Sequence, residues 1–451
     1  MRLIKQLQIL GRWLLAIGIG CISLCACAEE RLVVLTSYPQ EMVSQFEAAF
    51  EQAHPQYRLE VIWRQSADTQ KLLSEPGSGD VDVYWSPALR NFLQLRKQAQ
   101  LRQLPPIDGI AESVHGVQIA DPDHYFFASE IAGYGMVVNP QTISASGLPL
   151  PTDWQDIASP AWAGKVTLPI PSQVGFAPGL YEAILGALGW NDGWRIIHQM
   201  AAQAKLATAG STFVTDDVAS GNFAVGLTID FFAHAAIANG QPLKFVYPHH
   251  VGYSPAHIGI LQSSRHVAAA EAFVAFVLSD AGQALLFHPD IRKLPVRASA
   301  YSQAPAGYFN PFTQSVSTAN QTSLETLLRR QALTSAVFDA CITRPQATLD
   351  SMWQQLRQAE AQQTGASPSL TEARALAEMP LISEREAEDV HLQTVFRARR
   401  ENPAYEAETA QYEARWNQEI QQRHARVMAL IQQKPAQQTE ATGKTGQLTS
   451  P

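Results

Sequence analysis

Residues suited to anion binding stand between an apolar run and a helix-like pattern near the middle of the chain. The apolar run ends at Pro171, and Ser172, Gln173 and Gly175 follow it. Short hydroxyl-bearing and glycine residues ahead of a helix leave its first backbone N–H groups free. These groups carry partial positive charge and can hold an anion without a cationic side chain. The stretch is therefore either an anion-binding loop or a plain connection between two elements.

Polar residues also follow strand-like runs in the first hundred positions. Ser37 ends the first run, Arg64 ends the second, and Trp85 with Ser86 ends the third. Ligands of open α/β sheets lie at the carboxyl ends of the strands. The Arg64 guanidinium can clamp a phosphate or carboxylate through two hydrogen bonds. The alternative for Arg64 is an ordinary solvated side chain.

Several of these polar residues also suit helix capping. Ser37 opens a Ser-x-x-Gln capping box, and Ser86 precedes a proline that suits a first helical turn. Asp230 precedes a helix-like run that Gly240 ends. Helix starts that converge at one cleft also assemble anion sites. The structural role and the binding role both stay open at each position.

No catalytic or metal-binding motif stands out. His249, His250 and His257 lie close together, but their spacing fits neither one helix face nor H-E-x-x-H. We find no G-x-S-x-G, no G-x-G-x-x-G after a strand and no carboxylate pair marked by its surroundings. We therefore expect no metal, no cofactor and no enzymatic activity. Tyr247 and Tyr253 flank a loop-like stretch and either hydrogen-bond a ligand or pack a hinge.

The composition is that of a folded protein with more than one domain. A length of 451 residues predicts two or three domains. The hydrophobic fraction of 46% suffices for large cores, and 16% charged residues argue against disorder of the whole chain. The net charge of −8 argues against general nucleic-acid binding. It does not exclude an anionic ligand, because helix N-termini bind anions.

The first 28 residues follow the pattern of a secretory signal peptide. A positively charged segment precedes the apolar run Trp13–Leu24, which is too short for a comfortable membrane span. Ala26-Cys27-Ala28 fits the A-x-A cleavage pattern, and lipoprotein processing at Cys27 is the alternative. Both predict an exported, periplasmic protein. Only Cys341 is left after this segment, so we expect no intrachain disulfide.

Residues 31 to about 300 alternate short strand-like and longer helix-like runs. Such alternation predicts parallel sheets in an α/β protein. Strands are expected at 31–37, 57–63 and 80–86, and helices at 38–55, 67–76 and 87–101. Two longer strand-like stretches, 126–139 and 243–261, suit chain segments that pass between two lobes.

The last third of the chain has a different amino-acid composition. From about Ser302 it is rich in Gln, Ala, Glu and Arg, with helical periodicity over 323–342 and 407–433. The residues from Pro435 onward are polar and are expected to form a disordered tail.

Four segments, taken together and in their order along the chain, indicate a protein family. They are "PTDWQDIASPAWAGKVTLPIPS", "GLTIDFFAHAAIANGQPLKFVYP", "SPAHIGIL" and "AEAFVAFVLSDAGQALLFHPDIRKLPVR". In this order they resemble extracellular solute-binding proteins of ABC importers, in the branch of ferric-iron, phosphonate and phosphoglycerate binders. The "FHPDIRKLPVR" ending and the long helical extension are most similar to the phosphoglycerate-linked members. The resemblance covers about residues 31–300 and extends more weakly to about residue 360.

The resemblance implies an α/β type II periplasmic-binding-protein fold, in which two lobes joined by two crossover strands close on a ligand. It also implies a division of the chain. The parts are a signal peptide (1–28), lobe 1 (29–128 with 246–300), lobe 2 (129–245), a helical extension (301–434) and a disordered tail (435–451).

The resemblance further places ligand contacts on both lobes and on the return crossover. The strand ends and helix starts that match the family add Tyr38, Phe176, Thr228 and Ser254 to the residues named above. The predicted ligand-binding set is Ser37, Tyr38, Arg64, Trp85, Ser86, Ser172, Gln173, Gly175, Phe176, Thr228, Asp230, Tyr247 and Ser254.

One departure from the family separates the possible ligands. Ferric-iron relatives have adjacent tyrosines where this chain has Phe231-Phe232, and phenylalanine has no phenolate oxygen for Fe(III). We therefore expect a small anionic, phosphoglycerate-like metabolite, captured by a monomer for the membrane subunits of an ABC importer or for a membrane sensor kinase. The alternatives are a ferric-iron-binding transport protein and a secreted enzyme that acts on a phosphorylated metabolite.

Overall fold

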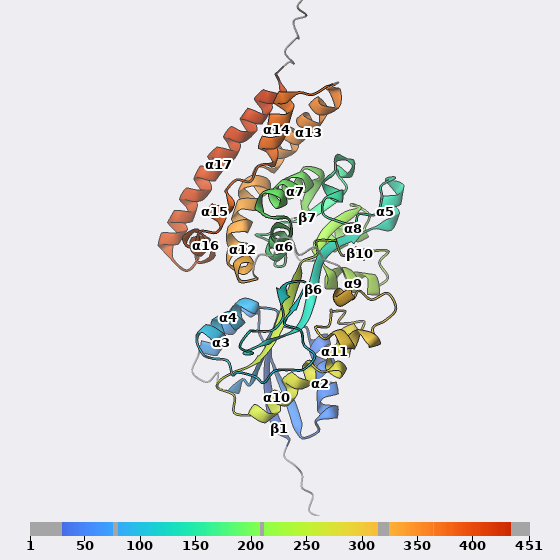
Figure 1. Cartoon of the computed structure of the whole chain (residues 1–451), viewed down its shortest axis with the longest axis vertical. Coiled ribbons are helices and arrows are strands. Elements are labelled where there is room, and N and C mark those ends of the chain that lie inside the picture. Colours follow the sequence, from blue (N-terminus) through green and yellow to red (C-terminus); the bar gives the residue numbers. More distant parts are fainter. Residues whose placement is uncertain (1–28, 75–79, 208–211, 314–323, 364, 434–451) are drawn as a thin grey trace, which may run out of the picture.

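The computed structural model describes residues 29–74, 80–207, 212–313, 324–363 and 365–433. Within these ranges the chain forms two α/β lobes and a group of helices that lies against one of them (Figure 1). The predicted signal peptide, including Cys27, and the predicted tail from Pro435 lie outside the described residues.

Lobe 1 is built around β1 (Glu30–Thr36), which is buried from Leu32 onward. An uninterrupted buried run is typical of a parallel strand that is covered on both faces. Strand β1 pairs in parallel with β2 (Tyr57–Trp63) and with β3 (Val83–Ser86). The other elements of this lobe are α2 (Gln40–Ala53), α3 (Ser66–Ser74), α4 (Leu89–Lys97), β4 (Ser113–Val114), β5 (Val117–Gln118), α10 (Val267–Val277) and α11 (Asp280–Ala284).

Strand β6 (Phe127–Val138) runs through both lobes, and every one of its 12 residues is buried. Its first half, up to Gly133, pairs with β11 (Tyr253–Ile260) of lobe 1, and its second half pairs with β9 (Val225–Ile229) of lobe 2. The lobes therefore share one nine-stranded sheet, in the order β2-β1-β3-β11-β6-β9-β7-β8, with β10 beside β6.

Lobe 2 continues this sheet with β7 (Val166–Pro169), which lies parallel to β9 and to β8 (Ala204–Ala207). Strands β7 and β9 are completely buried, as expected for strands with helices on both faces. The helices of this lobe are α5 (Pro140–Ala145), α6 (Ala177–Leu188), α7 (Trp190–Gln203), α8 (Phe213–Ala219) and α9 (Asp230–Ala238).

The second connection between the lobes differs from the sequence prediction. The pattern over 243–261 predicts one long strand, whereas the structure has β10 (Lys244–Val246) and β11 separated by the loop 247–252. Pro248 in this loop has no N–H group to donate to a strand ladder, which disfavours a continuous strand at this point. Both short strands still pair with β6, so the chain still crosses twice between the lobes.

The predicted capping box at Ser37 is wrong. Helix α2 begins at Gln40, after Pro39, and has no side-chain cap. The turn before α2 places Ser37 too far from the helix, and its hydroxyl instead lies 3.1 Å from that of Ser86. The predicted cap at Ser86 is also wrong, because α4 begins at Leu89 with Ala88 at the N-cap position and no side-chain cap. The Ser86 hydroxyl accepts the N–H of Ala88 at 3.3 Å, ahead of the helix.

The helical extension shares a hydrophobic core with lobe 2. Trp190 and Trp194 of the lobe belong to the same buried cluster as Val337, Trp353 and Trp416 of the extension. Its elements are α12 (Leu324–Phe338), the π-helix Asp339–Thr343, α13 (Gln346–Gln362), α14 (Pro368–Glu378), α15 (Glu384–Ala387), α16 (Val390–Arg397) and α17 (Pro403–Ile431). Figure 1 shows this group of helices beside α6 and α7. The segment before α12 packs elsewhere, since Tyr308, Phe309 and Phe312 lie against the lobe 1 core.

Among the described helices, no single one is long and apolar enough to cross a membrane. Helix α10 and the stretch Asp280–Phe287, bent by 52°, pass this test together by length and composition alone. The apolar residues of α10 include Phe273 and Val274, which belong to the buried core of lobe 1.

A buried ion pair fastens α12 to α6. The Arg330 guanidinium donates to the Glu182 carboxylate, with Nη2–Oε2 and Nε–Oε2 distances of 2.8 and 3.0 Å. The Thr334 hydroxyl donates to the same carboxylate. The Arg330 and Glu182 side chains are 3% and 1% exposed. Loss of one partner of such a pair leaves an uncompensated buried charge.

We predict that Arg330→Met destabilises the protein by about 3–5 kcal/mol, because it leaves the Glu182 carboxylate buried without its cation. The measurement is the free energy of unfolding in urea, followed by circular dichroism. Adding Glu182→Gln to this variant should recover most of the loss, since no buried charge is then left.

The matched control is Arg31→Ala, which removes an exposed ion pair with Glu60 whose two side chains are each 51% exposed. Exposed pairs contribute about 0–1 kcal/mol. A loss for Arg330→Met as small as that of the control would contradict the role assigned to the buried pair.

Candidate functional site

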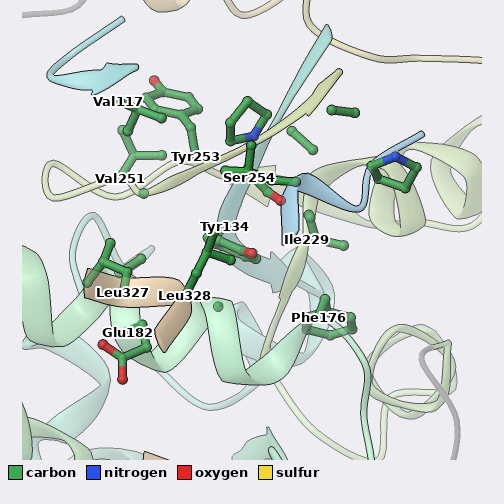
Figure 2. A pocket seen from close by; sticks show the side chains of 18 of the residues that line it. Val117, Tyr134, Phe176, Glu182, Ile229, Val251, Tyr253, Ser254, Leu327 and Leu328 are labelled. Atoms are coloured by element: carbon green, nitrogen blue, oxygen red, sulfur yellow. The ribbon is translucent and has the colours of Figure 1, made fainter. Parts of the chain in front are cut away.

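A cavity of about 460 Å³ lies where the two lobes and the helical extension meet. Its walls come from the start of α4 in lobe 1, from both crossover segments, from α6 and α9 of lobe 2, and from α12. Figure 2 shows Tyr134 and Ser254 in the middle, with Phe176 to one side and Leu327 and Leu328 to the other. Strand ends that converge on a cleft are a usual place for a small-molecule site in α/β proteins.

The start of α6 forms part of the lobe 2 wall. Gly175 and Phe176 line the cavity directly before the first helical residue, Ala177. The helix has no side-chain cap. Its first N–H, at Ala177, donates to the Val174 carbonyl at 3.0 Å, and Pro178 has no N–H, so the N–H groups at this end without a backbone hydrogen bond in the described structure are those of Gly175, Phe176 and Gly179. A Cβ atom added at Gly175 would meet nothing within 4 Å. The glycine of the predicted anion-binding loop therefore faces open space at the cavity.

A lysine supplies a positive charge to the cavity wall. Lys293 lines the cavity, and its Nζ donates to Oε1 of Glu130 at 2.7 Å. The same oxygen accepts the hydroxyl of Tyr38 at 2.9 Å, while Glu130 Oε2 has no hydrogen-bond partner in the described structure. Lys293 Nζ also lies 4.5 Å from the ring centroid of Phe231 in lobe 2. The cation therefore sits between the lobes.

Sequence reasoning missed both Lys293 and Glu130. Lys293 lies in the "FHPDIRKLPVR" ending that carries the family resemblance, but nothing local marks it as a site residue. A bridge between Leu294 and Ile131 brings this segment to β6, and that long-range pairing has no sequence signal. Glu130 did have a sequence signal, because a carboxylate inside a long apolar strand is rare unless it has a partner.

Asp230 lies behind the cavity and holds the crossover segments together. It is the first residue of α9, and the N-cap position is Ile229, so the predicted capping role is wrong. Its Oδ2 accepts the N–H of Gly133 at 2.7 Å and the hydroxyl of Tyr247 at 3.0 Å. Burial raises the pKa of Asp230 to about 7. Thr228, two residues earlier, is completely buried in β9.

The predicted residues of lobe 1 lie near the cavity without lining it. The Ser37 and Ser86 hydroxyls contact each other, and Pro87, which follows them, does line the cavity. Tyr38 is 3% exposed and Trp85 is 0% exposed, both in the lobe 1 core. Tyr38 therefore meets the cavity wall through Glu130, to which it donates, and through Lys293, whose Nζ lies 5.4 Å from its ring centroid, and Trp85 packs behind it.

Three other predicted residues point away from the cavity. Arg64 is exposed, follows the edge strand β2 and donates to the carbonyl of Trp63 at 2.8 Å. The Ser172 hydroxyl donates to Asp339 of the extension at 3.1 Å. Gln173 is exposed. The loop before α6 thus turns Ser172 and Gln173 away from the cavity, buries Val174 in the lobe 2 core and presents Gly175 to the cavity.

Neutral hydroxyl groups line the middle of the cavity. Ser254 is half-buried on β11, and Tyr134 on β6 lies so close to α6 that a Cβ at Gly179 would come within 2.2 Å of its oxygen. The Tyr253 hydroxyl has no hydrogen-bond partner in the described structure. Burial raises the pKa of Tyr134 to about 12 and also raises the pKa of Tyr253. Both therefore offer a hydroxyl that donates and accepts.

Among the residues that the structure describes, no group of three or more His, Cys, Asp or Glu side chains could hold a metal ion. His257 is buried in lobe 1, where desolvation lowers its pKa to about 3, and His250 pairs with Asp153 at 2.6 Å. The cavity offers a helix start, the cations of Arg90 and Lys293, and neutral hydroxyls, while its two carboxylates, Glu130 and Glu182, are each paired with a cation. This combination suits reversible binding of a small anion.

Comparison with known proteins finds one matching family. Residues 81–309 match the family described as bacterial extracellular solute-binding protein. The phosphoglycerate transport regulatory protein PgtC of Salmonella typhimurium is 26% identical over 373 residues, which cover 81% of this chain and 89% of that protein.

Solved structures of periplasmic binding proteins show the same fold. AfuA from Actinobacillus pleuropneumoniae, solved with exogenous fructose-6-phosphate bound, matches with a TM-score of 0.52 and 21% identity over 64% of this chain and 92% of its own. Iron-bound HitA from Pseudomonas aeruginosa matches with a TM-score of 0.53 and 16% identity over 66% and 97%. The predicted two-lobed periplasmic-binding-protein fold is confirmed.

We predict that Asp230→Asn flattens the pH dependence of stability between about pH 4 and pH 7. The pKa of Asp230 in the folded protein, about 7, lies above the ordinary value of 3.8. Within this window the folded protein keeps a proton that the unfolded chain has lost, so stability from this group falls as the pH rises. The expected fall is about 1.4 kcal/mol per unit of pKa difference.

Urea unfolding of both proteins at pH 4, 5.5 and 7 checks this, and all other titrating groups cancel in the comparison. Asparagine keeps an oxygen to accept the Gly133 N–H. If the free energy of unfolding changes with pH equally in the two proteins, the Asp230 carboxyl has an ordinary pKa.

Proposed function

Because the chain belongs to the family of bacterial extracellular solute-binding proteins, we propose that it binds a small phosphorylated metabolite of the phosphoglycerate kind in the cavity between its lobes. The phosphate meets the backbone N–H groups at the start of α6, beside Gly175 and Phe176. Lys293 adds a positive charge from the lobe 1 side. The rest of the solute faces the hydroxyls of Ser254 and Tyr134.

The extent of the likeness to PgtC carries this proposal. A match over 81% of a 451-residue chain is longer than the 313 residues that precede the gap before α12, so it continues into the helical extension. The AfuA and HitA structures use 92% and 97% of their own chains to match 64% and 66% of this one. We therefore infer that PgtC shares the helical extension with this chain, whereas AfuA and HitA lack it.

The charges of the cavity favour a phosphate over a ferric ion. The rings of Phe231 and Phe232 lie at the start of α9, tilted by 49° with centroids 4.5 Å apart, and they offer no oxygen ligand. Lys293 lies against the Phe231 ring and repels a cation at this point. Ferric-iron binding is the competing outcome in the ligand test below.

Of the residues predicted from the sequence, we assign solute contacts to Gly175, Phe176 and Ser254, which line the cavity. Ser37 and Ser86 stay proposed contacts at the lobe 1 edge. Tyr38, Trp85, Thr228, Asp230 and Tyr247 support the walls from behind, and Arg64, Ser172 and Gln173 have no part in the proposed site.

The proposed setting is outside the cytoplasm. The protein acts as a monomer that is either released by cleavage after Ala28 or held by a lipid at Cys27. Its partner is a membrane protein, either the membrane subunits of an ABC importer or a sensor kinase, and it binds no nucleic acid. It releases its solute without chemical change, as a binding protein rather than an enzyme. The family and the regulatory description of PgtC support this setting.

We predict that 3-phosphoglycerate raises the melting temperature of residues 29–451 by several degrees. A ligand at about 100 times its Kd stabilises a protein by about 2.7 kcal/mol. The test panel contains 2- and 3-phosphoglycerate, phosphoenolpyruvate, fructose 6-phosphate, inorganic phosphate and ferric citrate. A shift with ferric citrate alone would reassign the ligand to iron, and loss of 3-phosphoglycerate on incubation would indicate an enzyme.

We predict that Gly175→Asp weakens binding of 3-phosphoglycerate about a hundredfold or more, because like charges about 4 Å apart repel by several kcal/mol near a protein surface. The open space at Gly175 allows the fold to accept the side chain. Gly175→Asn is the matched control, with the same shape and no charge, and should bind within about threefold of the wild type. Isothermal titration calorimetry gives both affinities. Equal affinities for the two variants would remove the α6 start from the site.

A further inference from the structure

One wall of the cavity comes from the helical extension rather than from either lobe. Leu327, Leu328 and Gln331 of α12 line it together with residues of the lobes. Figure 2 shows Leu327 and Leu328 beside α6, away from Phe176 at the start of that helix. The two ends of the cavity are therefore built from different parts of the chain.

The α12 wall is held firmly in place. Arg330 stands between the cavity-lining residues in the sequence, pairs with the buried Glu182 carboxylate and lies 4.9 Å from the ring centroid of Trp190. Thr334, one helical turn later, donates to the same carboxylate. Side chains on a helix fixed in this way present their groups with little loss of conformational freedom on binding.

The same wall is also attached to lobe 1. The carbonyl of Leu328 accepts a hydrogen bond from Arg90 Nη2 at 3.2 Å. The Leu328 side chain packs against the lobe 1 cluster that contains Tyr84 and Phe92. Helix α12 thus contacts both lobes at the edge of the cavity between them.

The chemistry of this end differs from that of the α6 start. Small residues of α6, including Gly179, Ala183 and Gly186, line the cavity together with α12. The half-buried Gln331 places its Nε2 3.6 Å from the position that a Cβ would take at Gly179.

We propose that α12 is a specificity-determining wall of the solute site. Gln331 hydrogen-bonds the polar group at the end of the solute remote from the phosphate, and Leu327 and Leu328 pack against its carbon atoms. The solute class is a phosphorylated metabolite whose carbon skeleton carries a carboxylate or hydroxyl at that end. This inference rests on the proposed function and adds to it that the extension, not the two lobes alone, selects the solute.

The two ends then have separable effects on affinity. The α6 start and Lys293 bind the phosphate, which every phosphorylated compound has. The α12 wall contacts only what is attached to the phosphate. A change at α12 should therefore alter the preference for 3-phosphoglycerate over inorganic phosphate, whereas a change at Gly175 should weaken both.

The experiment measures the Kd of 3-phosphoglycerate and of inorganic phosphate for residues 29–451 by calorimetry, directly or by competition. Gln331→Ala should raise the Kd of 3-phosphoglycerate about tenfold, because it removes a hydrogen bond to a charged group. The Kd of inorganic phosphate should change by less than about twofold, since phosphate bound at the start of α6 does not reach α12. Leu327→Trp, which fills the α12 end, should give the same selective loss.

Arg329→Ala is the matched control on α12, since the Arg329 side chain is 44% exposed and does not line the cavity. It should leave both affinities unchanged. The inference is overturned if Gln331→Ala and Leu327→Trp behave like this control, or if they weaken both probes equally, while Gly175→Asp abolishes binding as proposed. Failure of the wild type to bind either probe would instead overturn the proposed function, and this inference with it.

Discussion

Strand β6 is the constraint on which the rest of the structure depends. All of its 12 residues are buried, and it pairs with strands of both lobes. Packing around it is so close that a Cβ at Gly133 would come within 2.6 Å of the Tyr247 ring, and one at Gly135 within 2.5 Å of the Val246 carbonyl. Because both lobes are built outward from this strand, their helix starts and strand ends border a single cavity, and Lys293 reaches it from the segment that pairs with β6.

The buried carboxylates around this cavity are each compensated, which leaves its wall suited to an anion. Glu130 is paired with Lys293, and Glu182 is paired with Arg330. Asp230 accepts two hydrogen bonds, and burial raises its pKa to about 7. With these negative charges balanced, the partial positive charge at the start of α6 is available to a solute. The Glu182–Arg330 pair has a second consequence, because it brings α12 and the extension to the cavity edge.

The sequence predicted the local parts of this structure and missed the long-range ones. The alternation of strand-like and helix-like runs located β1, β2 and the helices that follow them, and the segment order identified the two-lobed fold. The glycine before α6 was found because its spacing to a helix start is local. The pairing of Lys293 with Glu130 and the arrival of α12 at the cavity were not found, since each joins residues more than a hundred positions apart. The helix starts at Ser37 and Asp230 were misassigned, because tertiary partners took up the side chains that local rules assign to caps.

The most direct test of the account is equilibrium dialysis of residues 29–451 against radiolabelled 3-phosphoglycerate. The account predicts saturable retention of one solute per chain, displaced by unlabelled 2- or 3-phosphoglycerate and not by glycerate, because the phosphate at the start of α6 supplies the main attraction. Retention no higher than that of the Gly175→Asp variant, or displacement by glycerate as effectively as by 3-phosphoglycerate, would contradict it.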